Sequence, residues 1–195
     1  RWKEQVATGG GIFYDLVPHL LDQALLLFGC PEQLSCQQRV LRTGGQAADY
    51  VQLQLHYPQL EVVLATSPVN GFATQRFMLQ GDLGCYRQVH SDPQEAQLRA
   101  GLSPEHPTFG CYPAAQAGQL WLAATAQWQD LPTIAGQYRQ FYQQFCQALQ
   151  GRAALPVTPS ELRQVMRLLA LANQSATEQR TIDLADACSD IADGA

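Results

Sequence analysis

The sequence predicts an α+β fold, a mostly antiparallel open sheet of about six strands with helices packed on one face. An apolar helix near the N-terminus ends at Gly29, short alternating segments follow, and two amphipathic helices close the chain. The 195 residues, 46% of them hydrophobic, supply enough apolar surface for one large core. We therefore expect a single domain over residues 1–185, followed by a loose tail at 186–195.

The composition excludes several classes of partner. A net charge of -5 with only 15% charged residues leaves no basic stripe for nucleic acid. No apolar run approaches the ~20 residues that cross a bilayer, so we expect no membrane contact. The opening residues, Arg1-Trp2-Lys3, are neither an initiator Met nor a signal peptide, so we expect a chain that begins partway through a longer protein. The expectation of a cytoplasmic location rests on the cysteines. The six cysteines form no C-x-x-C pair, and we expect all of them to be reduced.

The first helix carries the most informative pattern. Gly9-Gly10-Gly11 opens it, and Gly29 followed by Cys30-Pro31 ends it. Inside it, Asp15, His19 and Asp22 stand four and three residues apart, so all three project from one face. Asp is a mediocre helix former, so three short titratable groups in an apolar helix require a reason.

Two interpretations of this helix compete. In one, Asp15 complements the helix dipole and His19 is a satisfied core histidine. In the other they form a proton-handling pair, in which the carboxylate fixes the imidazole tautomer and shifts a pKa that is ordinarily near ~6.5. Gly10 and Gly11 then allow a ligand to approach the backbone at the helix start.

The next third of the chain predicts strands. They cover residues 33–42, 50–57, 60–66, 75–80, 83–89 and, further on, 118–125, and the second and third form a hairpin. Residues 50–57 alternate strictly, which is typical of a half-buried strand with Gln52, Gln54 and His56 on its polar side. We expect His56 to be solvated or to form a cross-strand contact. Such a polar, nearly uncharged face can meet a second copy of itself.

A short helix and a long loop follow. Asp92-Pro93 predicts an N-cap with Pro at the first helical position, and Glu95 completes a start that resembles a capping box. Just before it, Tyr86 and Arg87 are interpreted either as a pair at a strand edge or as residues that line a pocket. Residues 102–117, rich in Pro and Gly, predict a long loop that can serve as a lid.

Two helices are expected at the end of the chain. Aromatic residues recur at helical spacing over residues 138–149, and we interpret this stripe, like Trp121 and Trp128, as core. Thr158-Pro159-Ser160-Glu161 is a capping box, so a helix begins there. Its inward face is expected to consist of Leu162, Val165, Met166, Leu169 and Ala172, and an edge strand is expected over 181–184.

Residues 9–22, Gly-Gly-Gly-x-x-x-Asp-x-x-x-His-x-x-Asp, followed by Leu-Phe-Gly-x-Pro at 27–31, resemble the start of the C-terminal domain of the Gfo/Idh/MocA family of NAD(P)-dependent oxidoreductases. Asp-Pro-Gln-Glu at 92–95 and Tyr-x-x-Phe-Tyr at 138–142 extend the similarity over residues 2–184. The resemblance implies that Asp15 and His19 help remove the substrate hydroxyl proton while hydride passes to the nicotinamide. Close family members have Gly where this chain has Val17, whose branched side chain is expected to narrow the pocket.

The resemblance also implies partners. It assigns Asp22, Tyr86 and Arg87 to substrate binding, places Gly10 and Gly11 near the cofactor, and implies a sugar or polyol substrate. NAD or NADP would be bound mainly by an N-terminal Rossmann domain absent from this chain, and two copies would form a homodimer through the sheet. No G-x-G-x-x-G follows a strand and the family's Glu-Lys-Pro motif is missing, so the chain alone is expected to be inactive.

Two alternatives from other classes stay open. Asp15, His19 and Asp22 are residue types that also bind Mn, Fe or Zn, which gives a metal site. The other alternative is a binding or dimerisation module without chemistry, in which the three polar residues form only a structural network and Val17 closes the pocket.

Overall fold

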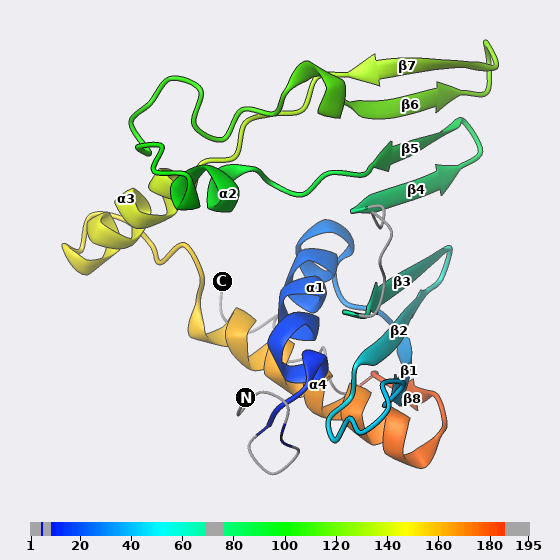
Figure 1. Ribbon diagram of the computed structural model, residues 1–195. Coiled ribbons are helices and arrows are strands. Elements are labelled where there is room, and N and C mark those ends of the chain that lie inside the picture. Colours follow the sequence, from blue (N-terminus) through cyan, green and yellow to red (C-terminus); the bar gives the residue numbers. More distant parts are fainter. Residues whose placement is uncertain (1–4, 6–8, 69–75, 186–195) are drawn as a thin grey trace. The chain divides into compact units, whose positions relative to one another are not determined.

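The computed structural model describes residues 5, 9–68 and 76–185 (Figure 1). The internal contacts divide the chain into two units, one formed by residues 1–71 with 157–195 and the other by residues 72–156. Each unit has its own antiparallel sheet of four strands. The α+β class and the antiparallel pairing are therefore confirmed, whereas the expected single sheet of about six strands is corrected to two sheets. The expectation of one domain over residues 1–185 stays a prediction.

The sheet of the first unit has the strand order β3-β2-β1-β8. It consists of β1 (Gln33–Arg39), β2 (Tyr50–Tyr57), β3 (Leu60–Thr66) and β8 (Ile182–Asp183). The hairpin of β2 and β3 has the predicted boundaries, and its turn joins the paired residues Tyr57 and Leu60. The edge strand β8 is also confirmed, but it pairs with only two residues of β1, Gln33 and Leu34.

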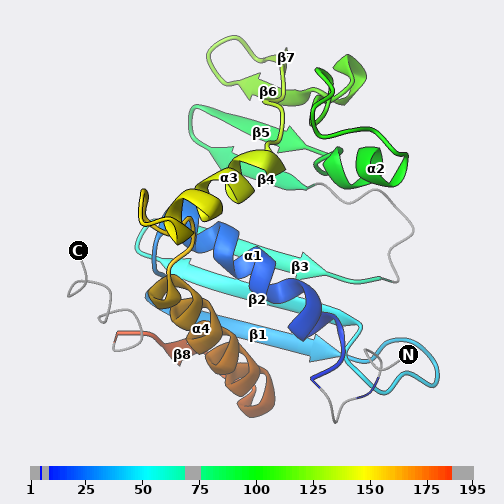
Figure 2. The ribbon, with the colours of Figure 1, turned by 90° about the vertical axis from the view of Figure 1, so that its left-hand side faces the viewer.

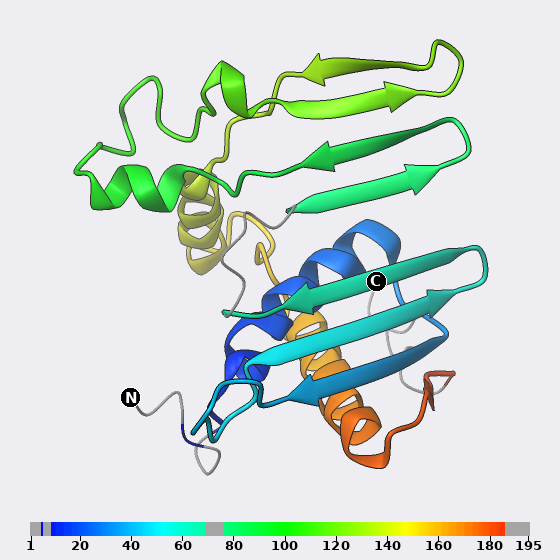
Figure 3. The same ribbon diagram turned by 45° about the vertical axis from the view of Figure 1, so that its right-hand side comes forward.

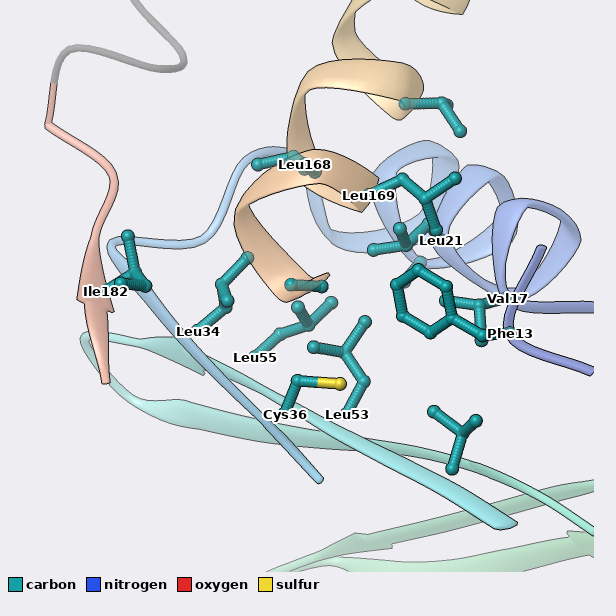
Figure 4. Packing of buried hydrophobic residues seen from close by; sticks show 14 of the residues in the cluster. Phe13, Val17, Leu21, Leu34, Cys36, Leu53, Leu55, Leu168, Leu169 and Ile182 are labelled. Atoms are coloured by element: carbon teal, nitrogen blue, oxygen red, sulfur yellow. The ribbon is translucent and has the colours of Figure 1, made fainter. Parts of the chain in front are cut away.

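Two helices, α1 (Ile12–Phe28) and α4 (Pro159–Glu178), lie side by side across one face of this sheet (Figures 2 and 3). The core lies between them and the strands (Figure 4). Phe13, Val17 and Leu21 reach into it from α1, and Leu168 and Leu169 from α4. The strands contribute Leu34, Cys36, Val51, Leu53, Leu55 and Ile182. The alternation in β2 places these apolar residues inward, as its sequence predicts.

The start of α4 confirms the predicted capping box. Thr158 accepts a hydrogen bond from the Glu161 backbone N–H, and the Glu161 carboxylate accepts one from the Thr158 N–H. Val165, Leu169 and Ala172 are buried as predicted. Leu162 and Met166 are exposed, against expectation, because the buried stripe is centred between Leu168 and Leu169 and these two positions fall at its rim.

The second unit has a sheet of order β4-β5-β6-β7. Its strands are β4 (Phe77–Gly81), β5 (Gly84–Gln88), β6 (Gly118–Leu122) and β7 (Gln127–Leu131), and its helices are α2 (Gln94–Arg99), the short 3₁₀ turn η3 (Ala114–Gln116) and α3 (Tyr138–Leu149). Strand β7 was not predicted, because only Trp128 and Leu131 are apolar in it. Its side chains, like those of β4, are exposed.

The aromatic stripe of α3 was predicted to be core, and this prediction is wrong. No residue of α3 is buried, and the exposed side chains include Tyr138, Phe141, Tyr142, Phe145 and Leu149. Trp128 is likewise no packing anchor, because its side chain is 51% exposed. The amphipathic pattern predicts the helix correctly but not what its apolar side meets.

Buried polar side chains organise this unit. Gln94 of α2 is 1% exposed; its side-chain amide donates to Asp92, and its carbonyl oxygen accepts from the Tyr138 N–H at 2.8 Å. The Asp92 carboxylate also accepts from the Gln94 N–H. The helix nevertheless begins at Gln94 with Pro93 at the N-cap, one residue later than predicted, and the expected start that resembles a capping box does not form. Glu95 instead forms an ion pair with Arg99 one turn on.

The loop at 102–117 is tied to this helix. The Gln97 side chain accepts from the Gly110 N–H at 2.7 Å and donates to the Thr108 and Cys111 carbonyls. Gly110 is required there, since a Cβ would collide with the Gly136 carbonyl and its φ is +78°. The loop is confirmed, and its role as a lid stays a prediction.

The cysteines differ from expectation in one case. Cys30 is disulfide-bonded, whereas Cys36, Cys85, Cys111 and Cys146 are free. Cys188 and the expected loose tail lie outside the described residues. Burial raises the pKa of Cys36 to about 12, so its thiol is protonated and inert as a nucleophile at neutral pH.

Candidate functional site

The exposed face of α1 carries the three polar residues that the sequence singled out. Asp15, His19 and Asp22 are all exposed and lie on one side of the helix. Val17 is 1% exposed and packs in the core on the other side, so it does not narrow a pocket at this face. The interpretation of His19 as a core histidine is wrong. The structure instead presents an exposed imidazole on the same helix face as two carboxylates.

Pro18 adds a feature to this face that sequence reasoning missed. It lies inside α1, where it has no N–H to give to the carbonyl of Tyr14 one turn before. The Tyr14 carbonyl oxygen is therefore without its helical hydrogen bond, next to Asp15 in the chain. A proline in the middle of an apolar helix was the available signal.

The glycines at the helix start have a structural reason. Gly11 has a φ of +90°, and a Cβ on it would lie 3.0 Å from the Ala48 carbonyl oxygen. The same oxygen accepts a hydrogen bond from the Ile12 N–H at 3.1 Å. The first helical N–H is thus used by this chain's own loop, and phosphate binding at this N–H has no support. Gly9 also has a positive φ, +67°, although a Cβ on it would meet no atom of the described residues within 4 Å.

Large apolar side chains flank the polar triplet on α1. Tyr14, Leu16 and Leu27 are exposed, and Leu26 is 84% exposed. Exposed apolar side chains of this size next to a group of polar residues are typical of a surface that another protein surface or a ligand covers.

Tyr86 and Arg87 belong to the second unit and are described with it. They lie on β5, which is an inner strand of its sheet, so the interpretation as a strand-edge pair is wrong. The Arg87 guanidinium lies 4.6 Å from the centre of the Trp128 ring, and its Nε donates to Gln119. The Tyr86 ring lies against Gly118, where a Cβ would collide with it. Whether either residue binds substrate stays a prediction.

Tyrosines gather near Asp92 in the same unit, a grouping that sequence reasoning missed. Burial raises the pKa of Tyr112, and the charge of Asp92 raises it further while Arg76 lowers it. Burial and the Asp92 charge also raise the pKa of Tyr138. These residues are far apart in the sequence, so no local spacing signals that they meet.

A polar network crosses the outer face of the first sheet. His56 Nε2 lies 3.3 Å from Ser35 Oγ, and His56 Nδ1 lies 2.8 Å from a Glu61 carboxylate oxygen. Gln54 also donates to Glu61, and these bonds hold the pKa of Glu61 below its ordinary value. The expectation of a cross-strand histidine is confirmed, because His56 and Glu61 are paired in register.

Two features are absent from the described residues, a cluster of metal-binding side chains and a helix that could span a membrane. No three His, Cys, Asp or Glu side chains in that part of the chain are arranged to hold a metal ion, so the metal alternative has no geometric support. In the same part of the chain, no helix has the length and apolarity that crossing a bilayer requires.

The family model described as the C-terminal alpha/beta domain of the oxidoreductase family Gfo/Idh/MocA matches residues 1–184. The chain belongs to this family. It is 36% identical over 186 residues to the uncharacterized oxidoreductase YdgJ of Escherichia coli, and 32% identical over 189 residues to the scyllo-inositol 2-dehydrogenase (NADP⁺) IolW of Bacillus subtilis. The crystal structure of an oxidoreductase from Bacillus cereus matches 93% of this chain with a TM-score of 0.81 at 26% identity.

The matched length limits what these relatives show. The two alignments cover 95% and 94% of this chain but only 54% and 52% of YdgJ and IolW, so the chain spans about half the length of these curated relatives. The Bacillus cereus structure is matched over 62% of its own chain. The matches therefore establish the family and the oxidoreductase character of its members, and they do not extend to the activity of a whole protein.

Proposed function

We propose that this chain is the substrate-binding half of an NAD(P)-dependent oxidoreductase that acts on a sugar-like or polyol alcohol. The observation that carries the proposal is the open polar face of α1, where His19 lies between two carboxylates, Asp15 and Asp22, at helical spacing. The family membership supports the class of reaction, and the inositol dehydrogenase among the relatives supports a polyol as substrate.

In this proposal the side chains of α1 handle the proton. His19 accepts the proton of the substrate hydroxyl, and Asp15, one turn earlier, orients the imidazole and stabilises its charged form. Asp22 and the Tyr14 carbonyl accept hydrogen bonds from further hydroxyls. A bound nicotinamide would accept the hydride that leaves the carbinol carbon.

The dinucleotide is proposed to lie mainly on another domain. This chain has no strand–G-x-G-x-x-G–helix motif. The first N–H of α1 after the glycine run, that of Ile12, already donates a hydrogen bond to the Ala48 carbonyl. The exposed apolar side chains beside the triplet, such as Leu16 and Leu26, give such a domain a surface to cover. Contact between Gly10 and the cofactor is retained as part of the proposal.

The decisive experiment compares two histidine variants in a protein that joins this chain to a dinucleotide-binding domain. His19→Asn is expected to lower kcat/KM for scyllo-inositol by about 10²–10⁴-fold without lowering Tm, because positioned acid–base catalysis has this magnitude and the side chain is exposed. His106→Asn, a change at an exposed loop histidine, is the matched control and should leave kcat/KM unchanged.

The result can go against the proposal in two ways. Equal activity of His19→Asn and the parent would remove His19 from the chemistry. No binding of NAD(H) or NADP(H) to the joined protein in calorimetry would make the module without chemistry the better hypothesis.

The homodimer through the sheet is a separate part of the proposal. The outer face of β2 and β3 is polar but almost uncharged, with Gln52, Gln54 and the 55%-exposed Val63 among its residues. Sedimentation equilibrium of the parent and of Val63→Lys tests it. A dimer that dissociates in the variant supports this face, and a dimer that persists moves the interface elsewhere.

A further inference from the structure

A hollow of about 400 Å³ lies at the edge of β1, within the first unit. It exists because β8 stops short: β8 pairs with Gln33 and Leu34, so among the described strands none pairs with the remainder of this edge. The end of α4 covers part of it. Ser175 Oγ accepts from the Cys36 N–H at 2.9 Å and donates to the Arg180 carbonyl at 2.6 Å. The edge is therefore closed by side chains, with space left beside them.

The hollow is lined mainly by hydrogen-bond donors. Arg39 and Arg180 line it, and none of the described residues that line it is Asp or Glu. The Arg180 guanidinium is ion-paired at 2.6 Å with Glu178, which does not line the hollow, so Arg39 supplies the positive charge for a ligand. The hydrogen bond described for Arg39 runs from one terminal nitrogen to a backbone carbonyl, which leaves most of its five donors for a ligand. Gln52 accepts the Tyr50 hydroxyl with its carbonyl oxygen, so its NH₂ group also remains for a ligand.

The backbone conformation of Gln179 gives an independent indication that its side chain has a role at the hollow. This residue ends α4 with φ 52° and ψ 42°, a left-handed conformation that Gly adopts at lower cost. Gln179 is also one of the residues that line the hollow. The glutamine thus remains in a strained backbone conformation, and its side-chain NH₂ group offers two more hydrogen-bond donors to the hollow.

We propose that this hollow is a second ligand site, which binds a small oxyanion: the carboxylate or phosphate group of a sugar-sized molecule. Arginine and amide donors without a lining carboxylate select such groups, because charge-assisted hydrogen bonds to an oxyanion are the strongest that they form. The volume falls in the range of small-molecule pockets. No residue of α1 lines the hollow, so the site does not depend on the proposed catalytic face. Gln52 and Gln54 in its wall also belong to the face proposed for the homodimer, so in a dimer through that face the anion site would lie beside the interface.

Calorimetry on the 195-residue chain tests the proposal with three probes: inorganic phosphate, gluconate and neutral myo-inositol. Phosphate or gluconate should bind saturably, and myo-inositol should not. Tighter binding of gluconate assigns a sugar acid, and tighter binding of phosphate assigns a phosphate ester. Arg39→Gln should weaken anion binding at least about tenfold. Arg163→Gln, which removes the same charge from exposed α4 outside the hollow, should leave it unchanged.

A second variant separates binding from structure. Gln179→Gly relieves the left-handed strain, so Tm should stay the same or rise, while anion affinity falls several-fold as the amide is lost. Unchanged affinity in Arg39→Gln, or equal losses in Arg39→Gln and Arg163→Gln, would overturn the proposal. Equal binding of myo-inositol and the anions would overturn the choice of ligand.

Discussion

The two units of the chain are stabilised in different ways. Among the described residues, every buried hydrophobic side chain except Phe109 belongs to the first unit, where two helices cover a sheet (Figure 4). The second unit buries glutamines instead, Gln88 and Gln94, and exposes the apolar side of α3 and the strands β4 and β7. The first unit thus has an apolar core of its own, and the second is held by strand pairing and specific hydrogen bonds.

This difference teaches what an apolar pattern can and cannot specify. The stripe on α1 and the stripe on α3 both predict a helix, and both helices form. Phe13 on α1 is 1% exposed, whereas Phe141 on α3 is 44% exposed. The period of the pattern fixes the local structure, and the partner surface decides burial.

The largest expected effect comes from the matched pair of phenylalanines. Phe13→Ala should lower the free energy of unfolding of the first unit by about 3–5 kcal/mol, because it leaves a cavity in a close-packed core. Phe141→Ala should cost less than about 1 kcal/mol, since its ring is half in solvent. Native-state hydrogen exchange read unit by unit measures both. Equal costs would mean that α3 has an apolar partner in the folded chain.

The second effect concerns the polar interior of the second unit. Gln94→Ala should destabilise that unit by about 1–3 kcal/mol, because it leaves the Tyr138 N–H without its partner and removes the side-chain amide that donates to the Asp92 carboxylate. Glu95→Ala, at the exposed neighbour, is the control and should have little effect. Hydrogen exchange at residues 136–140 reports the loss. A Gln94→Ala protein as stable as the control would show that water replaces these bonds fully.

The third effect is the cap of α4. Thr158→Ala should cost the first unit about 1 kcal/mol, since it removes the side chain that accepts from the Glu161 N–H. Thr158→Ser keeps the hydroxyl and should restore most of the loss. Urea unfolding followed by far-UV circular dichroism measures the two variants, and equal costs for Ala and Ser would assign the effect to the lost methyl group.

Much of the first unit could be predicted from sequence for physical reasons. The strict alternation in β2 and the capping box at Thr158 are local signals, and both elements begin where they indicate. The expectation for Val17 was wrong although spacing was sufficient to correct it: two residues from Asp15, Val17 lies about 200° around α1, on the side that packs against the sheet. Arg39 and Gln179 meet at one hollow only through the fold.

The candidate site was predicted to the extent that it lies on one helix. Asp15, His19 and Asp22 share a face because helical spacing alone requires it. The grouping of Tyr112 with Asp92, by contrast, depends on a loop that Gln97 ties down, and no local pattern encodes it. Resemblance to the family added the assignment of roles, which spacing alone could not give.

The smallest expected effect is a change of stability with pH that comes from Asp49 in the first unit. It is confined to acid pH. The Asp49 side chain is buried, and it accepts from the Leu41 N–H at 2.6 Å, the Arg42 N–H at 3.0 Å and the Arg42 side chain at 2.9 Å. The Leu41 backbone hydrogen bond, followed by those of Arg42, holds the pKa of Asp49 below its ordinary value. A lowered pKa in the folded state contributes stability that is fully present above the unfolded pKa of about 4.

This contribution is lost as the pH falls through the folded pKa of Asp49, because the unfolded chain then binds the proton more readily. The contribution of Asp49 to the free energy of unfolding of the first unit should therefore decline below about pH 4 and stay level above it. Asp49→Asn keeps one acceptor oxygen but cannot titrate, so its stability should vary less over the same acid window. Urea unfolding at a series of pH values between the acid range and neutrality measures both slopes. Parallel slopes for Asp49→Asn and the parent would assign the acid sensitivity to other carboxylates, of which Glu161 at the α4 cap, with a pKa also lowered by hydrogen bonds from Thr158, is the first to test.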